Sequence, residues 1–175
     1  IENAGLTGRI VEQEKLRKDV ELATEVQRRL LPESAPITPM AQLAGLSIPA
    51  RGVGGDSYDF LSLEGNRFAF SIGDVSGKGI PASLLMASLQ SALRGQAMSA
   101  PSDLGVMMGT LNKLIYDSSP SNRYATLFYA EYHRDTRELV YVNGGHNAPM
   151  ILRGDEFIRL EATGPVVGLF RPGVY

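Results

Sequence analysis

The segment from Phe68 to Leu89, FAFSIGDVSGKGIPASLLMASL, changes its hydrophobic period halfway along. Apolar residues alternate with polar ones as far as Asp74, which is the period of a half-buried strand. Glycines at positions 77 and 79 interrupt this pattern, and Pro81 then stands near the start of an apolar pattern with helical period. The segment therefore predicts a strand, a glycine loop and a helix, with a carboxylate where the strand ends.

The patterns on either side place this segment in an α+β domain. Residues 61–63 and 67–72 predict two strands joined by the turn EGN. A second helix is predicted after PSD, with Ser102 as its N-cap, and short strands follow from Tyr124 onward, separated by Asp, Gly and Asn. Strands, then two helices, then strands is the order of an α+β domain with antiparallel sheets, not of repeating βαβ units.

The first part of the chain, residues 6–31, predicts a helix with a narrow apolar stripe. Residues 1–31 contain six acids and six bases, so most of this helix is expected to face water. Two interpretations remain open: the helix packs on its own domain, or it is a dimerising or signal-carrying helix with a coiled-coil-like seam. Pro32 ends the helix, which divides the chain into an N-terminal helix at 1–31 and a domain at 32–175. The stripe consists of Leu16, Val20, Ala23, Val26 and Leu30.

Charge and cysteine content exclude several classes of function. The formal net charge is −2 and no basic patch is interleaved with aromatic residues, so nucleic-acid binding is not expected. The chain has no cysteine, which excludes disulfides and thiolate metal sites and suits a reducing compartment, so a cytoplasmic location is expected. No apolar run is long enough for a membrane span, and no signal peptide is visible.

Two acidic clusters lie against glycines and are candidates for a metal site. GGDSYD contains Asp56 and Asp59, and GDVSGKG contains Asp74. Carboxylate and carbonyl oxygens are the ligands that Mg²⁺ and Mn²⁺ prefer, and two histidines without thiols are too few for a zinc site. Aspartate beside glycine is also the usual composition of a turn, so each acid alone could be a turn residue. The two clusters flank one predicted hairpin, which favours their convergence on a shared site.

Other catalytic patterns fit less well. GDVSGKG resembles a phosphate-binding loop, but only three residues separate Gly73 from Gly77, and Gly79 occupies the place of the Ser or Thr that holds magnesium. A nucleotide-binding switch is therefore the least favoured hypothesis. The chain has no nucleophile elbow, and NGGHNAP around His146 is interpreted as a turn between strands.

Four motifs in this order resemble a known family. RGVGGDSYDF, FSIGDVSGKGIPASLLMA, LNKLIYDSSPSNRYATLFYAEY and YVNGGHNAPMILRG are similar to the bacterial SpoIIE/RsbU-type branch of the metal-dependent, type 2C (PPM) serine/threonine protein phosphatases. The resemblance runs from about Gln27 to Phe170 without rearrangement. It implies a four-layer αββα sandwich, in which two antiparallel sheets are flanked by helices, preceded here by the N-terminal helix.

The resemblance also implies a site and a reaction. Asp74 matches the carboxylate that bridges two Mn²⁺ or Mg²⁺ ions, Val75 matches the residue whose main-chain carbonyl binds one ion, and Asp56 matches an acid that serves the same ions directly or through water. Asp59 is expected to have a supporting role. The implied reaction is hydrolysis of phosphoserine or phosphothreonine by metal-activated water, without a phosphoenzyme.

The partners implied by the resemblance belong to bacterial signalling. The substrate is expected to be a phosphorylated anti-sigma-factor antagonist, whose dephosphorylation releases a sigma factor, as in stress responses. A sensor domain is expected upstream, and the helix at 1–31 is expected to connect it to the metal site. Self-association as a homodimer is expected through Leu16, Val20 and Leu30. No contact with nucleic acid or membrane is expected for this segment.

Two departures from the family pattern leave a second function open. Family members have further aspartates in a DG-type turn and near the C-terminus, and residues 1–175 contain neither, so weak metal binding and little turnover are expected from these residues alone. Relatives also have a longer strand at the junction of Ile48 and Pro49. The alternative function is a non-catalytic scaffold of the same fold that binds a phosphoprotein or a signalling partner.

Overall fold

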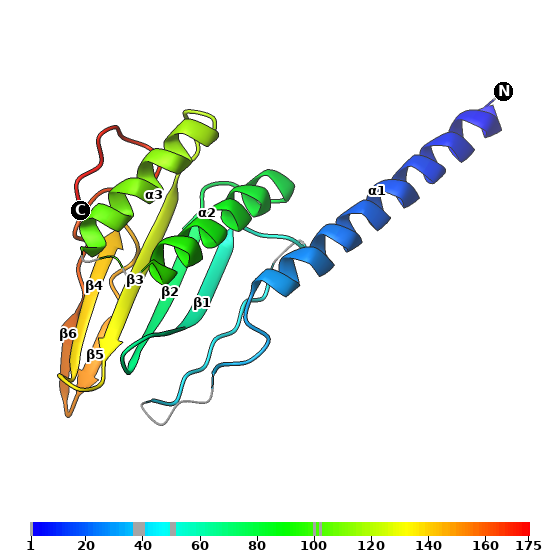
Figure 1. The fold of residues 1–175 in the computed structure, drawn as a ribbon. Coiled ribbons are helices and arrows are strands. Elements are labelled where there is room, and N and C mark those ends of the chain that lie inside the picture. Colours follow the sequence, from blue (N-terminus) through cyan, green and yellow to red (C-terminus); the bar gives the residue numbers. More distant parts are fainter. Residues whose placement is uncertain (1, 37–40, 50–51, 100, 102) are drawn as a thin grey trace.

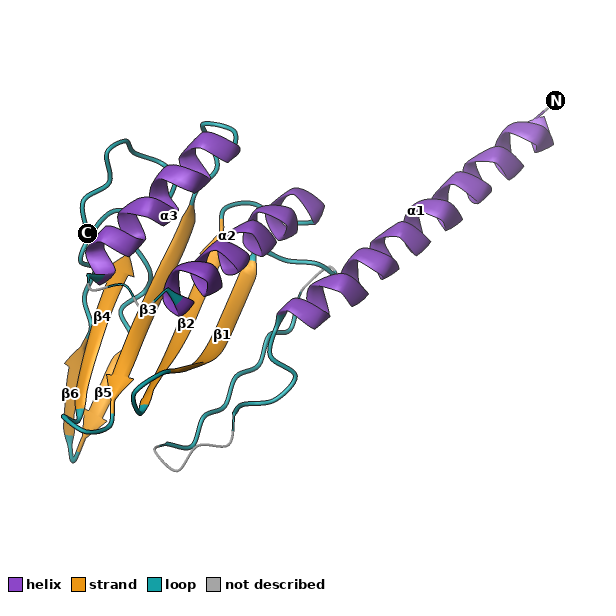
Figure 2. Ribbon diagram, in the orientation of Figure 1, coloured by secondary structure: helices purple, strands orange, loops and turns teal. Residues whose placement is uncertain are grey.

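The computed structural model describes residues 2–36, 41–49, 52–99, 101 and 103–175. It contains three long helices and two antiparallel sheets (Figure 2). In chain order the elements are α1 (Glu2–Leu30), β1 (Asp56–Leu63), β2 (Arg67–Val75), α2 (Ile80–Met98), α3 (Leu104–Ser118), β3 (Ala125–His133), β4 (Glu138–Gly144), β5 (Met150–Arg153) and β6 (Glu156–Arg159).

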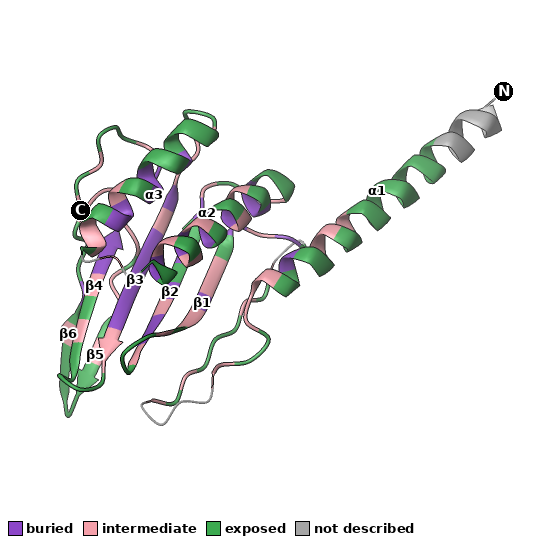
Figure 3. Cartoon of the chain, in the orientation of Figure 1, coloured by how far each residue is buried: buried purple, intermediate pink, exposed green. Residues whose placement is uncertain are grey.

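The larger sheet has the strand order β1-β2-β3-β4, and every neighbouring pair is antiparallel. The helices α2 and α3 lie side by side on one face of this sheet (Figure 1). Side chains alternate across a strand, so every second residue faces these helices, and those from Ala69 to Val75 and from Ala125 to Glu131 are buried (Figure 3). The main core therefore lies between α2, α3 and the sheet. Its fully buried members include Met86, Leu89, Met108, Leu111, Ile115, Leu127 and Tyr129.

The smaller sheet, β5 and β6, packs against the other face of the larger one. Phe128 and Ala130 of β3 are fully buried there and share a second apolar cluster with Ile151 of β5. The predicted α+β class with antiparallel sheets and an N-terminal helix is confirmed. In the described part of the chain the helical layer is α2 with α3, and the second sheet consists of β5 and β6.

The first hairpin is longer than the sequence pattern indicates. The predicted strands at 61–63 and 67–72 are confirmed, but β1 begins at Asp56 and β2 continues to Val75. Gly65 and Asn66 both have positive φ in the turn between them, which glycine and asparagine tolerate best. The two acidic clusters therefore belong to paired strands and do not lie in flanking loops.

The helix α1 projects away from the rest of the chain (Figure 1). Its predicted apolar stripe is only partly packed on the domain: Leu16 and Val26 are 62% and 63% exposed, whereas Val20, Ala23 and Leu30 are half-buried, and Val20 lies beside Gly52. The last turn makes hydrogen bonds to the domain, through Gln27 and the carbonyl of Leu30. None of the helices in the described part of the chain combines the length and apolar character needed to cross a membrane.

The predicted N-cap of α3 is wrong by one residue. Asp103 occupies this position, and its Oδ1 accepts hydrogen bonds from the main-chain nitrogens of Gly105 at 2.7 Å and Val106 at 3.1 Å. The neighbouring aspartate offers a charged acceptor to the free N–H groups of the first turn, where the helix dipole favours negative charge. Ser102 lies outside the described residues.

Candidate metal centre

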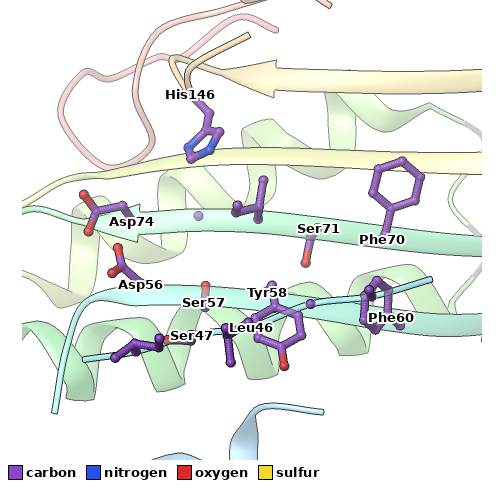
Figure 4. A pocket seen from close by; sticks show the side chains of 15 residues that line it. Leu46, Ser47, Asp56, Ser57, Tyr58, Phe60, Phe70, Ser71, Asp74 and His146 are labelled. Carbon is purple, nitrogen blue, oxygen red and sulfur yellow. The ribbon is translucent and has the colours of Figure 1, made fainter. Parts of the chain in front are cut away.

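Asp56 and Asp74 are directly opposite each other in the β1–β2 ladder. Directly opposed residues have Cβ atoms about 5 Å apart, on the same face of the sheet. Asp56 is the first residue of β1 and Asp74 the last but one of β2, so the pair lies at the edge where both strands end. Both side chains are exposed and their carboxylates point toward each other (Figure 4). The structure thus brings together the two acids that the sequence placed in separate motifs.

Electrostatic repulsion within this pair makes it suited to a cation. The pKa of Asp74 is raised, first because its carboxyl is partly shielded from water, then by the charge of Asp56 and by a hydrogen bond with that side chain. A raised pKa means that the two carboxylates do not easily stay ionised together. A divalent ion between them would remove this penalty, and oxygen donors suit Mg²⁺ or Mn²⁺. The donor chemistry therefore fits the implied ions.

The main chain of Val75 lies against Gly55, the residue that precedes Asp56. The Val75 nitrogen donates to the Gly55 carbonyl at 3.2 Å. A Cβ at Gly55 would lie 2.5 Å from the Val75 carbonyl oxygen, so a larger residue would push this oxygen away. The close approach explains the glycine at position 55 and fixes the backbone carbonyl of Val75 beside the acid pair.

Asp59 does not join the acid pair. It lies three residues after Asp56, and because side chains alternate along a strand it faces α2, where it is 1% exposed. The Arg94 Nη2 atom donates to its Oδ1 at 2.8 Å, and Gln90 Nε2 approaches its Oδ2 at 3.4 Å. Asp59 thus anchors α2 to β1.

His146 lies between β4 and β5, as predicted, and it also lines the cavity beside the acid pair. Its Nδ1 atom lies 2.8 Å from Thr126 Oγ1, and Thr126 is the cross-strand neighbour of Asp74 in β3. The buried side chain of Asn143 holds the main chain of His146, accepting from its nitrogen at 2.8 Å and donating to its carbonyl at 3.1 Å. Burial lowers the pKa of His146, and the charge of Asp56 opposes this effect. The imidazole is therefore held on the same face as the acid pair.

The acid pair and His146 share a cavity of about 440 Å³ (Figure 4). The rest of its wall is mostly apolar and comes from β1, β2 and the segment Ala44–Ile48. Tyr58, Phe60 and Phe70 extend the cavity away from the acids along the sheet (Figure 4). Within the described ranges, no group of three or more His, Cys, Asp or Glu side chains is arranged to hold a metal ion. The cavity thus contains two carboxylates and one imidazole from the described residues.

The helix α1 is joined to the segment that carries Asp56. Gln27 Nε2 donates to the Gly54 carbonyl at 2.6 Å, and the Gly54 nitrogen donates to Gln27 Oε1 at 3.0 Å. The Gln27 side chain is buried, with 7% of its surface exposed. Two hydrogen bonds to one residue fix both the position and the orientation of the peptide, so the last turn of α1 sets where Gly54 lies relative to the acid pair.

Comparison with known proteins identifies the group of proteins that the chain resembles. Residues 64–175 match the family described as Stage II sporulation protein E (SpoIIE). The chain is 29% identical over 163 residues to the phosphoserine phosphatase RsbU of Bacillus subtilis (strain 168), with 90% of this chain and 47% of that protein covered. It is 27% identical over 159 residues to the phosphoserine phosphatase RsbP of the same strain, with 88% of this chain and 39% of that protein covered. The chain thus spans about half or less of these relatives.

A solved structure shares the fold. The SiaA-PP2C domain of Pseudomonas aeruginosa has a TM-score of 0.73 and 19% sequence identity, and the match covers 90% of this chain and 64% of that one. At this identity the likeness concerns the fold alone. It agrees with the sheets and helices described above.

Proposed function

The chain belongs to the Stage II sporulation protein E family, and we propose that it is a metal-dependent protein serine/threonine phosphatase. The observation that carries the proposal is the opposed pair Asp56 and Asp74 at the mouth of a cavity. Two relatives named phosphoserine phosphatases align with most of the chain and add support. The reaction is hydrolysis of a phosphate ester of serine or threonine.

The residues that would hold two Mn²⁺ or Mg²⁺ ions are Asp56, Asp74 and the main-chain carbonyl of Val75. When bound, such ions supply an activated water near neutral pH and neutralise charge on the phosphoryl group. His146 is held by Thr126 and Asn143 on the same face as the acids, where its ring would face a bound phosphoryl group. The apolar remainder of the cavity lies to one side of this position.

For the substrate we propose a phosphorylated anti-sigma-factor antagonist in the bacterial cytoplasm. In this arrangement residues 1–31 form a regulatory helix between an upstream sensor domain and a phosphatase domain that starts at residue 32. The exposed positions Leu16 and Val26 suit a homodimeric helix pair, because an apolar stripe in water is stabilised by a second copy. The contact between Gln27 and Gly54 would carry a change in this helix toward Asp56.

The test is hydrolysis of p-nitrophenyl phosphate and of a phosphoserine protein by the full-length protein. We expect activity with Mn²⁺ or Mg²⁺, loss of activity in excess chelator, and at least a thousandfold decrease in kcat for Asp74→Asn. Asp155→Asn is the matched control, since Asp155 is exposed in the turn between β5 and β6. Full activity in chelator would refute the mechanism, and phosphoprotein binding without turnover would support the alternative, a non-catalytic scaffold.

A further inference from the structure

The loop that follows β2 is held by the residues that precede β3. The Ser76 nitrogen donates to the Tyr124 carbonyl at 2.8 Å, and the Tyr124 nitrogen donates to Ser76 Oγ at 3.0 Å. The Arg123 Nη1 atom donates to the Ser76 carbonyl at 2.7 Å. All three hydrogen bonds end on Ser76, the residue that directly follows Val75. Ser76 is therefore held on the β3 side of β2 by its nitrogen, its side chain and its carbonyl.

The bond at the Ser76 nitrogen also orients the carbonyl of Val75. These two groups belong to one peptide unit, and in a planar trans unit the N–H and C=O bonds point in opposite directions. Because the N–H points toward Tyr124, next to the start of β3, the Val75 carbonyl points toward β1 on the other side of β2. A Cβ at Gly55 would lie 2.5 Å from this oxygen, which agrees with that direction. The carbonyl is thus directed to the side on which Asp56 lies.

Arg123 is the side chain that restrains this loop. Its own main-chain nitrogen donates to the Pro120 carbonyl at 2.9 Å, in the connection between α3 and β3. Its guanidinium lies so close to Gly77 that a Cβ on this glycine would overlap the Nη1 atom. Gly77 also has a φ of 99°, a conformation that residues other than glycine rarely adopt. Glycine at position 77 therefore leaves the space that the Arg123 side chain occupies.

The charge of Arg123 strengthens its contact with the loop. Arg67 and Arg94 are paired with buried carboxylates, whereas Arg123 forms no ion pair within the part of the chain that the structure describes. Its guanidinium donates to a neutral carbonyl instead, and a hydrogen bond with a charged donor is stronger than one between neutral groups. Without this donor, the carbonyl of Ser76 would lose its partner and the loop would depend on the two bonds to Tyr124.

We propose that Arg123 is a positioning residue of the metal centre, which fixes Ser76 and thereby keeps the Val75 carbonyl directed toward the acid pair. It acts through the backbone of the loop and not by contact with the ions. This inference rests on the proposed function, because Val75 is one of the residues that would hold the ions. It gives a role to an arginine that stands 47 residues after Ser76 in the sequence.

The first experiment measures the loop of the full-length protein in excess chelator. Arg123→Ala should raise the amide hydrogen-exchange rate of Ser76 about tenfold, since local opening costs less without the guanidinium. Gly77→Ala, whose methyl group would displace the guanidinium, should raise it as well, which provides a second variant if the first does not fold. Arg134→Ala is the matched control, because Arg134 is exposed beyond the other end of β3 and should leave the rate unchanged. An unchanged rate in both loop variants would overturn the inference.

The second experiment measures the metal centre by NMR, with Mg²⁺ as the probe. Mg²⁺ should shift the ¹³C signal of the Val75 carbonyl in the unmodified protein, and titration of this signal should show about tenfold weaker binding in Arg123→Ala. Arg134→Ala should bind Mg²⁺ as the unmodified protein does. Equal Mg²⁺ affinity in Arg123→Ala and the unmodified protein would also overturn the inference. A Val75 signal that Mg²⁺ does not shift in the unmodified protein would instead count against the proposed function.

Discussion

The ion pair between Asp59 and Arg94 is a contact whose loss should be costly for stability. Asp59 is 1% exposed and accepts from Arg94 Nη2 at 2.8 Å. The Gln90 Nε2 atom donates to the Leu30 carbonyl at 2.8 Å and approaches the Asp59 Oδ2 atom at 3.4 Å. The pair therefore joins β1, α2 and the end of α1 in one polar network.

We expect Arg94→Met to lower the free energy of unfolding by about 2–3 kcal/mol. Removing one partner of a fully buried ion pair costs about 3–5 kcal/mol, because the remaining charge is left unpaired. The Arg94 side chain is 43% exposed, so water can reach part of the vacated position and the cost is reduced. Methionine keeps most of the aliphatic stem, which limits the loss of packing.

Urea denaturation followed by circular dichroism measures this change. In the double variant Asp59→Asn with Arg94→Met, no buried charge is left, so the loss should be at least 1 kcal/mol smaller than the sum of the two single losses. Arg159→Met is the matched control: its pair with Glu161 is 59% and 67% exposed, and its removal should cost less than about 0.5 kcal/mol. Equal losses for Arg94→Met and Arg159→Met would refute the reasoning.

Two further predictions concern the acid pair. Gln27→Ala removes both hydrogen bonds to Gly54, so it should lower the free energy of unfolding by about 1–3 kcal/mol. It should also raise the Mn²⁺ concentration needed for half-maximal activity. Gln13→Ala, on the exposed part of α1, should have neither effect. The folded state raises the pKa of Asp74 above 3.8, so the metal-free folded protein binds the carboxyl proton more tightly than the unfolded chain does. The contribution of this proton to stability therefore decreases as pH rises from 3.8 through the folded pKa. The difference in melting temperature between the protein and Asp74→Asn should therefore grow with pH across this window in chelator, and a difference that is constant with pH would contradict the assignment.

The local patterns of the sequence were sufficient for the elements but not for the full site. The change of period between Phe68 and Leu89 predicts β2 and α2, because a half-buried strand and a helix need different spacings of apolar residues. The ends of the first hairpin were missed, because Asp and Gly favour turns when taken alone, and only pairing with a neighbouring strand keeps them in the ladder. The position of His146 in the cavity was missed for a related reason. Its place beside Asp74 depends on the strand order β2-β3-β4, which brings Thr126 between them.

The separation of Asp56 from Asp59 shows how the same short motif serves two purposes. Their odd spacing in β1 puts one carboxylate on the cavity face and the other under α2. The buried one helps to fix α2 and the Leu30 carbonyl, while Gln27, three residues before Leu30, holds Gly54. Gly54 is two residues from Asp56, and Gly55 accepts from the Val75 nitrogen. A rotation of the last turn of α1 would therefore break its contacts with Gly54 and with α2 together. The position of Asp56 relative to Asp74 thus depends on how α1 packs against the domain.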